Sequence, residues 1–232
     1  VGRLKGSFDW KNDPHLALTL KGDNLLVRQA PMITAIVKPD LSLDVYPFAQ
    51  RLSLKGTIDV PRARISMPES SATVVNVSPD VRVVHQGQDL LATLKAAKPW
   101  DIRADMTVNL GNQVIFQGFE SNIPLVGRLH LSQRGLETAM RANGAIGVSQ
   151  KVKIEAYGQS LDLNRAIARF NGPLANPTLD VDTNKIIQGT IVGVRVTGTA
   201  SNPNIQVYND GGLTEQEAMN ALITGRINEG AN

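Results

Sequence analysis

Strict alternation of aliphatic and polar residues, the two-residue period of a half-buried β-strand, dominates this chain. The clearest run covers residues 101–110, where one parity is aliphatic and the other is polar or charged. Similar runs cover residues 16–20, 41–45, 52–60, 125–131, 152–156, 179–181, 192–196 and 205–207. Each run is one-sided, which favours antiparallel strands with one face in water. The chain is therefore predicted to be all-β, and residues 1–8 read as a strand already in progress.

Residues with turn chemistry separate these runs. Glycine and asparagine tolerate positive φ, and proline ends ladder pairing. Turns are predicted at residues 21–24, 110–112, 133–135, 142–144, 176–177 and 202–203. Residues 66–100 break the alternation and are predicted to form an irregular insertion or long loop, with a short helix over residues 89–97.

The C-terminal end changes from strand to helix character. Thr214 and Glu217 have the spacing of a capping box, in which each side chain accepts from the other residue's backbone N–H. An apolar helical face follows, and Gly225 suits the position just after the helix. A helix is predicted over residues 215–224. The chain is thus divided into a β-sheet domain, residues 1–212, and a C-terminal amphipathic helix within residues 213–226.

Composition narrows the possible partners. Hydrophobic residues make up 42% of the 232 residues but aromatic residues only 4%, so the apolar content is mainly aliphatic. Sugar and single-stranded nucleic-acid sites usually need aromatic faces, whereas hydrocarbon chains do not. The net charge is +3 with no run of five Lys or Arg, so no nucleic-acid partner is expected. No stretch approaches the 18 apolar residues of a membrane-spanning helix.

Catalytic and metal-binding parts are sparse in the sequence. His15, His85 and His130 lie far apart, and there is no cysteine to complete a zinc site. Asp180 and Asp182 share a parity and could serve acid–base chemistry or a cation. Such a pair more often forms the solvated face of an alternating strand. We therefore expect no enzyme, no metal and no cofactor.

The aliphatic face has two interpretations. Alternating strands commonly bury this face against a second sheet, as in a β-sandwich. Alternatively the face stays open and forms a groove, since large exposed apolar patches on soluble proteins are usually functional. The alternation alone leaves both open.

Several segments in order resemble the C-terminal domain of the TamB family. They read AYGQSLDL (156–163), FNGPLANPTLDV (170–181), VGVRVTGTA (192–200) and ALITGR (221–226). LGNQVIFQGF (110–119) and VGRL (126–129) resemble an upstream part of the same domain. The resemblance covers residues 101–226 well and the first hundred residues loosely.

This resemblance implies a fold and a cellular setting. The fold would be an elongated, curved, mainly antiparallel sheet that forms a U-shaped apolar trough, also called a β-taco. TamB-like proteins have a single inner-membrane anchor, cross the periplasm of Gram-negative bacteria, and partner the outer-membrane barrel protein TamA. Here the anchor would lie in a segment outside this fragment.

Two functions follow from the resemblance, both in outer-membrane biogenesis. One is phospholipid transport between the inner and outer membranes, with acyl chains in the hydrophobic groove. The other is chaperone-like assembly or translocation of outer-membrane β-barrel proteins and autotransporters together with TamA. A purely structural spacer is a third reading.

Combined with the shared parity of the alternating runs, the resemblance predicts which side chains line the groove. They are Ile102, Ala104, Met106, Val108, Leu125, Leu129, Leu131, Val152, Ile154, Leu179, Val181, Val194 and Val196.

Overall fold

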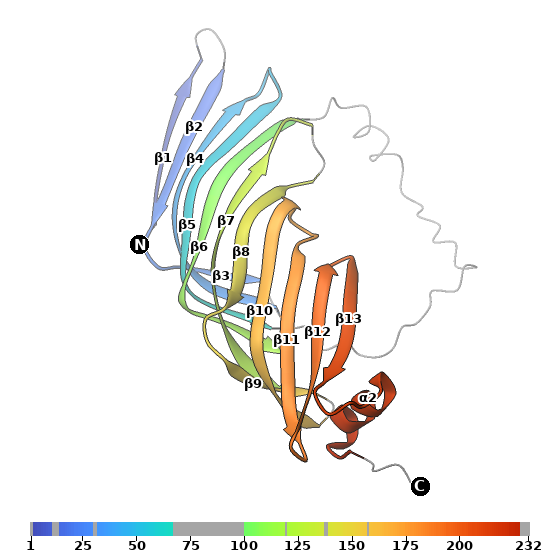
Figure 1. Ribbon diagram of the computed structural model, residues 1–232. Coiled ribbons are helices and arrows are strands. Elements are labelled where there is room, and N and C mark those ends of the chain that lie inside the picture. The colour runs from blue at the N-terminus through green and yellow to red at the C-terminus, as the bar shows by residue number, and fades with distance from the viewer. Residues whose placement is uncertain are drawn as a thin grey trace, which may run out of the picture.

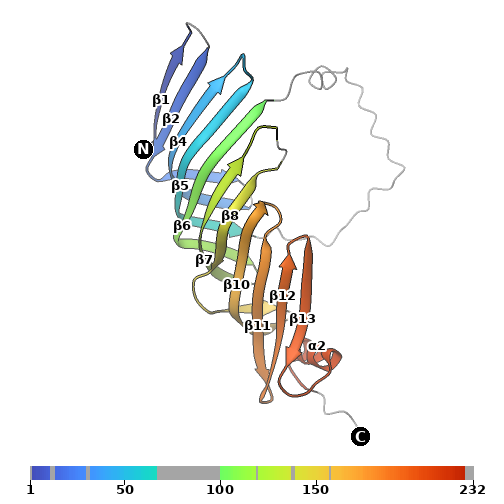
Figure 2. The ribbon, with the colours of Figure 1, turned by 45° about the horizontal axis from the view of Figure 1, so that its top comes forward.

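The computed structural model describes residues 2–10, 14–29, 32–66, 100–118, 120–136, 139–156 and 158–227. All strands in these ranges join a single 13-stranded sheet. The sheet is open and curved, with β1 at one edge and β13 at the other (Figures 1 and 2). One helix, α2, lies near the β13 edge. The predicted all-β fold with one short C-terminal helix is confirmed, whereas the two-sheet sandwich interpretation is wrong for the described residues.

The described part of the chain contains thirteen strands and helix α2. They are β1 (Gly2–Asp9), β2 (His15–Gly22), β3 (Leu25–Gln29), β4 (Ile33–Tyr46), β5 (Arg51–Ser66), β6 (Asp101–Gly118), β7 (Ser121–Gln133), β8 (Arg141–Val148), β9 (Val152–Ala156), β10 (Gln159–Pro173), β11 (Thr178–Ile187), β12 (Thr190–Thr199), β13 (Asn202–Asn209) and α2 (Glu215–Thr224). The order across the sheet is β1-β2-β4-β5-β6-β7-β8-β10-β11-β12-β13, with β3 beside β4 and β9 beside β10.

One pair of neighbours departs from the predicted antiparallel pattern. β5 and β6 run parallel, with Leu52 opposite Ile102 and Ile58 opposite Val108. All other neighbouring pairs are antiparallel. The prediction of a mainly antiparallel sheet is confirmed. Alternation could not reveal the parallel pair, because it reports which face a side chain occupies and not the direction of the neighbouring strand.

The predicted irregular segment at residues 66–100 lies outside the described residues except for its ends. Ser66 is the last residue of β5, and Trp100 directly precedes β6. The short helix predicted over residues 89–97 also lies outside the described residues.

Irregular pairings line up across the middle of four neighbouring strands. The register shifts between Ile36 and Lys38 on β4, between Val60 and Arg62 on β5, and again between β6 and β7. Extra residues in a ladder bend the strand and increase its twist. The long strands bend at mid-length (Figure 1).

The turn predicted at residues 110–112 is wrong, because these residues form part of this irregular line inside β6. A Cβ on Gly111 would lie 2.8 Å from the Cα of Pro61 on β5, so glycine allows the two backbones to approach closely.

The turn predicted at residues 142–144 is also wrong. Gly144 lies inside β8 with φ of 128°, and a Cβ there would lie 2.2 Å from the carbonyl oxygen of Arg128 on β7. An Asn-Gly dipeptide favours a tight hairpin. Here its glycine serves close approach of two strands instead.

The predicted C-terminal helix is confirmed in position and in its caps. The Glu217 N–H donates to Thr214 Oγ1 at 3.3 Å, and the Thr214 N–H donates to Glu217 Oε2 at 2.8 Å. The backbone and side-chain hydrogen bonds from Thr214 lower the pKa of Glu217. Gly225 ends the helix with φ of 72°. Ala218 and Ala221 share one buried cluster with sheet residues, and the division at residues 212–213 stays a prediction.

Candidate binding face

The register places aliphatic side chains of every strand in the main sheet order on one face. Partners directly opposite in neighbouring strands share a face. Val108 on β6 is opposite Ile58 on β5 and Leu129 on β7. The same relation links β1, β2, β4 and β5 through Phe8, Leu16, Val45 and Leu52. We call this side of the sheet the aliphatic face and the opposite side the polar face.

All thirteen residues predicted to line a groove lie on the aliphatic face. Met106 is opposite Leu131, and Val181 is opposite Val196. Val152 and Ile154 join the face through their β10 partners. Ala104, Met106, Leu129 and Ile154 are buried, Ile102 is 39% exposed, and the other eight are half-buried. The structure brings these residues onto one surface, and their role in holding a client stays a prediction.

The predicted set missed part of this face. Leu161 and Leu163 on β10 are buried within it, as are Val114 on β6 and Val192 on β12. On β10 the aliphatic parity is odd up to Leu163 and even from residue 166, because the register shifts between Leu163 and Arg165. A shift of parity inside an otherwise alternating run was the available signal. The β5 positions 52–60 were visible as an alternating run and also belong to the face.

Helix α2 covers the aliphatic face at its β12–β13 end. Ala218 and Ala221 are completely buried and Leu222 is 6% exposed. They form one cluster with Ile187, Val192 and other sheet residues. The segment after the helix is held by the Ile227 N–H, which donates to Gln188 Oε1 at 3.0 Å. This end of the face is therefore closed by the chain itself.

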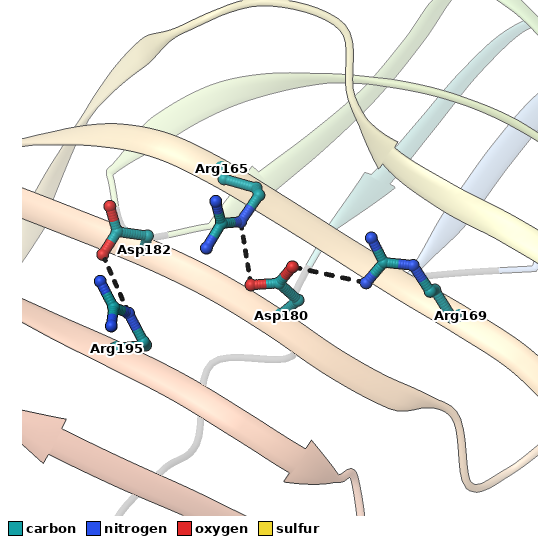
Figure 3. Close-up of polar contacts among 5 residues, drawn as sticks. All are labelled: Arg165, Arg169, Asp180, Asp182 and Arg195. Carbon is teal, nitrogen blue, oxygen red and sulfur yellow. Dashed lines mark hydrogen bonds and ion pairs between the residues drawn. The ribbon is translucent and has the colours of Figure 1, made fainter.

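Charged side chains lie on the polar face and pair across strands. Arg165 Nε on β10 contacts Asp180 Oδ1 on β11 at 2.9 Å, and Arg169 Nη1 contacts Asp180 Oδ2 at 3.4 Å (Figure 3). Arg195 Nε on β12 lies 3.7 Å from Asp182 Oδ1. Burial alone would raise the pKa of Asp180, but the hydrogen bonds and charges of the two arginines outweigh burial and lower it.

This geometry bears on the alternative role for Asp180 and Asp182 in acid–base chemistry. A carboxylate with a lowered pKa is ionised at neutral pH and cannot act as a proton donor there. Both aspartates instead form ion pairs across the sheet. Among the described residues, no group of three or more His, Cys, Asp and Glu is placed to hold a metal.

The two described histidines of the predicted set also lie on the polar face. His15 Nε2 is 2.9 Å from Asp44 Oδ1, and His130 Nε2 is 3.6 Å from Asp105 Oδ1. His85 lies outside the described residues. Within the described ranges, no helix has the length and apolar character needed to cross a membrane.

Chemically, such a face can take up apolar groups without specific hydrogen bonds. Each methylene that moves from water to an apolar surface gains about 0.8 kcal/mol. Buried polar side chains interrupt it rarely in the described part, Thr183 being the example, with its Oγ1 unpaired. The arrangement favours binding of extended hydrocarbon over recognition of a polar ligand.

Comparison with known proteins agrees with this geometry. The family model described as the TamB C-terminal domain matches residues 1–232. The chain is similar to the translocation and assembly module subunit TamB of Haemophilus influenzae, at 26% identity over 237 aligned residues. The alignment covers 96% of this chain but 18% of that protein's own length.

Proposed function

The chain belongs to the TamB C-terminal domain family, and from this membership and its aliphatic face we propose that it carries phospholipids between the inner and outer membranes. The acyl chains would lie on the aliphatic face, which would line a U-shaped trough. The domain would act without catalysis or cofactor, in the periplasm of a Gram-negative bacterium. It would form part of a longer single-pass inner-membrane protein that works with a TamA-like outer-membrane barrel in outer-membrane biogenesis.

The observation that supports this proposal is the continuity of the aliphatic face. Eleven strands follow one another in the main sheet order. At about 4.8 Å per strand spacing, ten spacings make the face about 48 Å long, and helix α2 covers its β12–β13 end. The charged ladders lie on the opposite face, so an acyl chain that moves from strand to strand meets few charges. Lys185 on β11, opposite Val192, is one of them, and its Nζ donates to Gln159 Oε1 at 2.7 Å. A surface of this kind lets lipids slide, since each step exchanges one aliphatic contact for another.

Arginine substitutions on the aliphatic face test the proposal. Ile102→Arg places a charge at a position that is 39% exposed, and Met106→Arg and Leu129→Arg place one at buried positions of the same face. Mass spectrometry under native conditions should find phospholipid with the original chain and about tenfold less with these variants, which corresponds to about 1.4 kcal/mol. Thr107→Arg, on the same strand but on the polar face, is the matched control and should retain its lipid.

The comparison counts only for variants whose circular dichroism shows a preserved sheet, and Ile102→Arg is the least disruptive. Undiminished phospholipid in a folded Ile102→Arg protein would contradict the proposal. Absence of phospholipid from the original chain would favour a structural spacer.

The sheet edges favour a second function, the assembly of outer-membrane β-barrel proteins and autotransporters. Every residue of β1 is exposed, and β13 is the edge on the other side. An extended client strand could add to such an edge through main-chain hydrogen bonds. Asn204→Lys on β13, where the exposed side chain lies on the polar face opposite Thr197, should weaken capture of an unfolded barrel segment and leave lipid content unchanged. Loss of both activities would show that they share one surface.

A further inference from the structure

Four large exposed apolar side chains lie where the ends of β1, β4, β5, β6 and β7 form one edge of the sheet. Trp10 follows β1, Phe48 lies between β4 and β5, Trp100 precedes β6 and Leu136 follows β7. Their exposed fractions are 72%, 78%, 42% and 64%, respectively. These strand ends form the upper edge in Figure 1. The chain has only two tryptophans, and both lie here.

Contacts along this edge link neighbouring strand ends. The ring of His15 at the start of β2 stacks on Tyr46 at the end of β4, with centroids 4.4 Å apart. The Asp101 N–H donates to the carbonyl oxygen of Gln50 at 2.8 Å, and the Ile102 N–H donates to that of Gly135 at 3.2 Å. The exposed side chains therefore stand in a row on a connected rim, which we call the interfacial edge.

Cations accompany the aromatic residues. A surface depression of about 990 Å³ adjoins the interfacial edge, and its lining includes Arg51, Lys55, Arg103 and Arg134. The Arg51 guanidinium lies 4.7 Å from the centre of the Tyr46 ring. The lining also contains two aspartates, Asp44 and Asp105, and each of them faces a histidine. Arginine and lysine therefore outnumber carboxylates in this depression.

We propose that the interfacial edge docks on the headgroup region of a phospholipid bilayer that contains anionic lipid. Tryptophan and other amphipathic aromatic residues favour the boundary between headgroups and acyl chains, and neighbouring cations attract lipid phosphates. The side chains project separately from successive strand ends and form a row, which suits a flat surface. Docking needs no acyl chain on the aliphatic face. It therefore goes beyond the proposed transport function and can be tested independently of it.

The positions of the tryptophans provide a direct measurement. Because Trp10 and Trp100 are the chain's only tryptophans, its intrinsic tryptophan emission reports on this edge alone. Adding vesicles of mixed phosphatidylcholine and phosphatidylglycerol should shift the emission of the 232-residue chain to shorter wavelength. Lipids brominated near the headgroup end of the acyl chains should quench it.

Substitutions that keep both tryptophans identify the groups responsible. The double variant Phe48→Ser, Leu136→Ser should bind these vesicles about tenfold more weakly, since it removes two large apolar side chains. Arg134→Glu should weaken binding to the anionic vesicles at least about fivefold and have little effect with phosphatidylcholine alone. Ile186→Ser is the matched control, because Ile186 is 68% exposed on β11, far from the edge, and should change nothing.

Two results would overturn the proposal. One is an emission that vesicles leave unchanged, or that changes equally in the double variant and the original chain. The other is a shift produced by monomeric short-chain phospholipid but not by vesicles, which would place lipid on the aliphatic face beside the tryptophans. Met106→Arg separates the two proposals, since it should lose bound phospholipid and retain the vesicle-induced shift.

Discussion

The two ends of the aliphatic face have the same sequence pattern and different surroundings. At the β11–β12 end, Ile187 is 3% exposed and Val192 is completely buried beneath α2. At the β1 end, Leu4 and Phe8 are 68% and 52% exposed. One end is an ordinary hydrophobic core and the other is an uncovered apolar surface.

This difference shows that the alternation of aliphatic and polar residues determines which face is apolar but not whether anything covers that face. Coverage here depends on a helix with small residues, Ala218 and Ala221, on its inner side. Stability and client binding are therefore expected to separate along one face. Substitutions at the covered end should lower the stability of the fold. Substitutions at the uncovered end should leave stability unchanged and weaken ligand binding.

A substitution that displaces helix α2 from the aliphatic face should lower the free energy of unfolding most. Ala221→Arg forces a long charged side chain into a fully buried position, and we expect it to lower the free energy of unfolding by about 3 kcal/mol or more. Leu4→Arg introduces the same side chain at the uncovered end and should change it by less than about 0.5 kcal/mol. Urea unfolding followed by circular dichroism measures both, and equal losses would contradict the separation.

A substitution that weakens the N-terminal cap of helix α2 should lower the free energy of unfolding by an intermediate amount. Thr214→Ala removes the hydroxyl that caps α2, which should cost about 1 kcal/mol. Hydrogen exchange should then quicken in the helix and in β12 beneath it, while β1 and β2 stay unchanged. Thr178→Ala, at an exposed threonine of β11, provides the control. Faster exchange throughout the sheet would show that the helix supports the whole domain.

The smallest expected effect concerns the polar face behind the covered end. The folded-state pKa of Asp180 is lowered, so its ion pairs stabilise the fold at neutral pH. That stabilisation is present above the unfolded pKa of about 4 and is lost as the pH falls through the lower folded value. The midpoint of urea unfolding should therefore fall as the pH is lowered through this range, and Asp180→Asn should make that fall smaller. Asp40→Asn, whose partner Lys21 is 68% exposed, should have less effect, and the reverse order would contradict the assignment.

Much of this fold could be predicted from local pattern, because burial on one side leaves a parity that is visible in the sequence. The alternation of residues 101–110 located β6 and its aliphatic side, and Thr214 with Glu217 located α2. Features that depend on neighbouring strands could not be predicted. Gly111 and Gly144 were interpreted as turn residues, because a hairpin and a close approach of two strands use the same amino acid.

The candidate site was predicted in part for the same reason. Parity grouped Met106 with Val108, and the register agrees. It could not follow β10, where the shift after Leu163 exchanges the two parities. It also could not show that Trp10, Phe48 and Trp100 share an edge, since only the sheet order brings their strand ends together.

The parallel pairing of β5 with β6 has a kinetic consequence. Most other neighbours in the sheet are joined by short connections, but 34 residues (67 to 100) separate Ser66 from Asp101. Closing a loop several times longer than a hairpin turn costs about 2 kcal/mol more in chain entropy, by the rule of about 0.6 kcal/mol per doubling. The hairpins of residues 2–66 and of residues 101–209 should thus form early, and the seam between them should close last. Within the described residues, the parallel pair β5–β6 therefore determines the order of assembly.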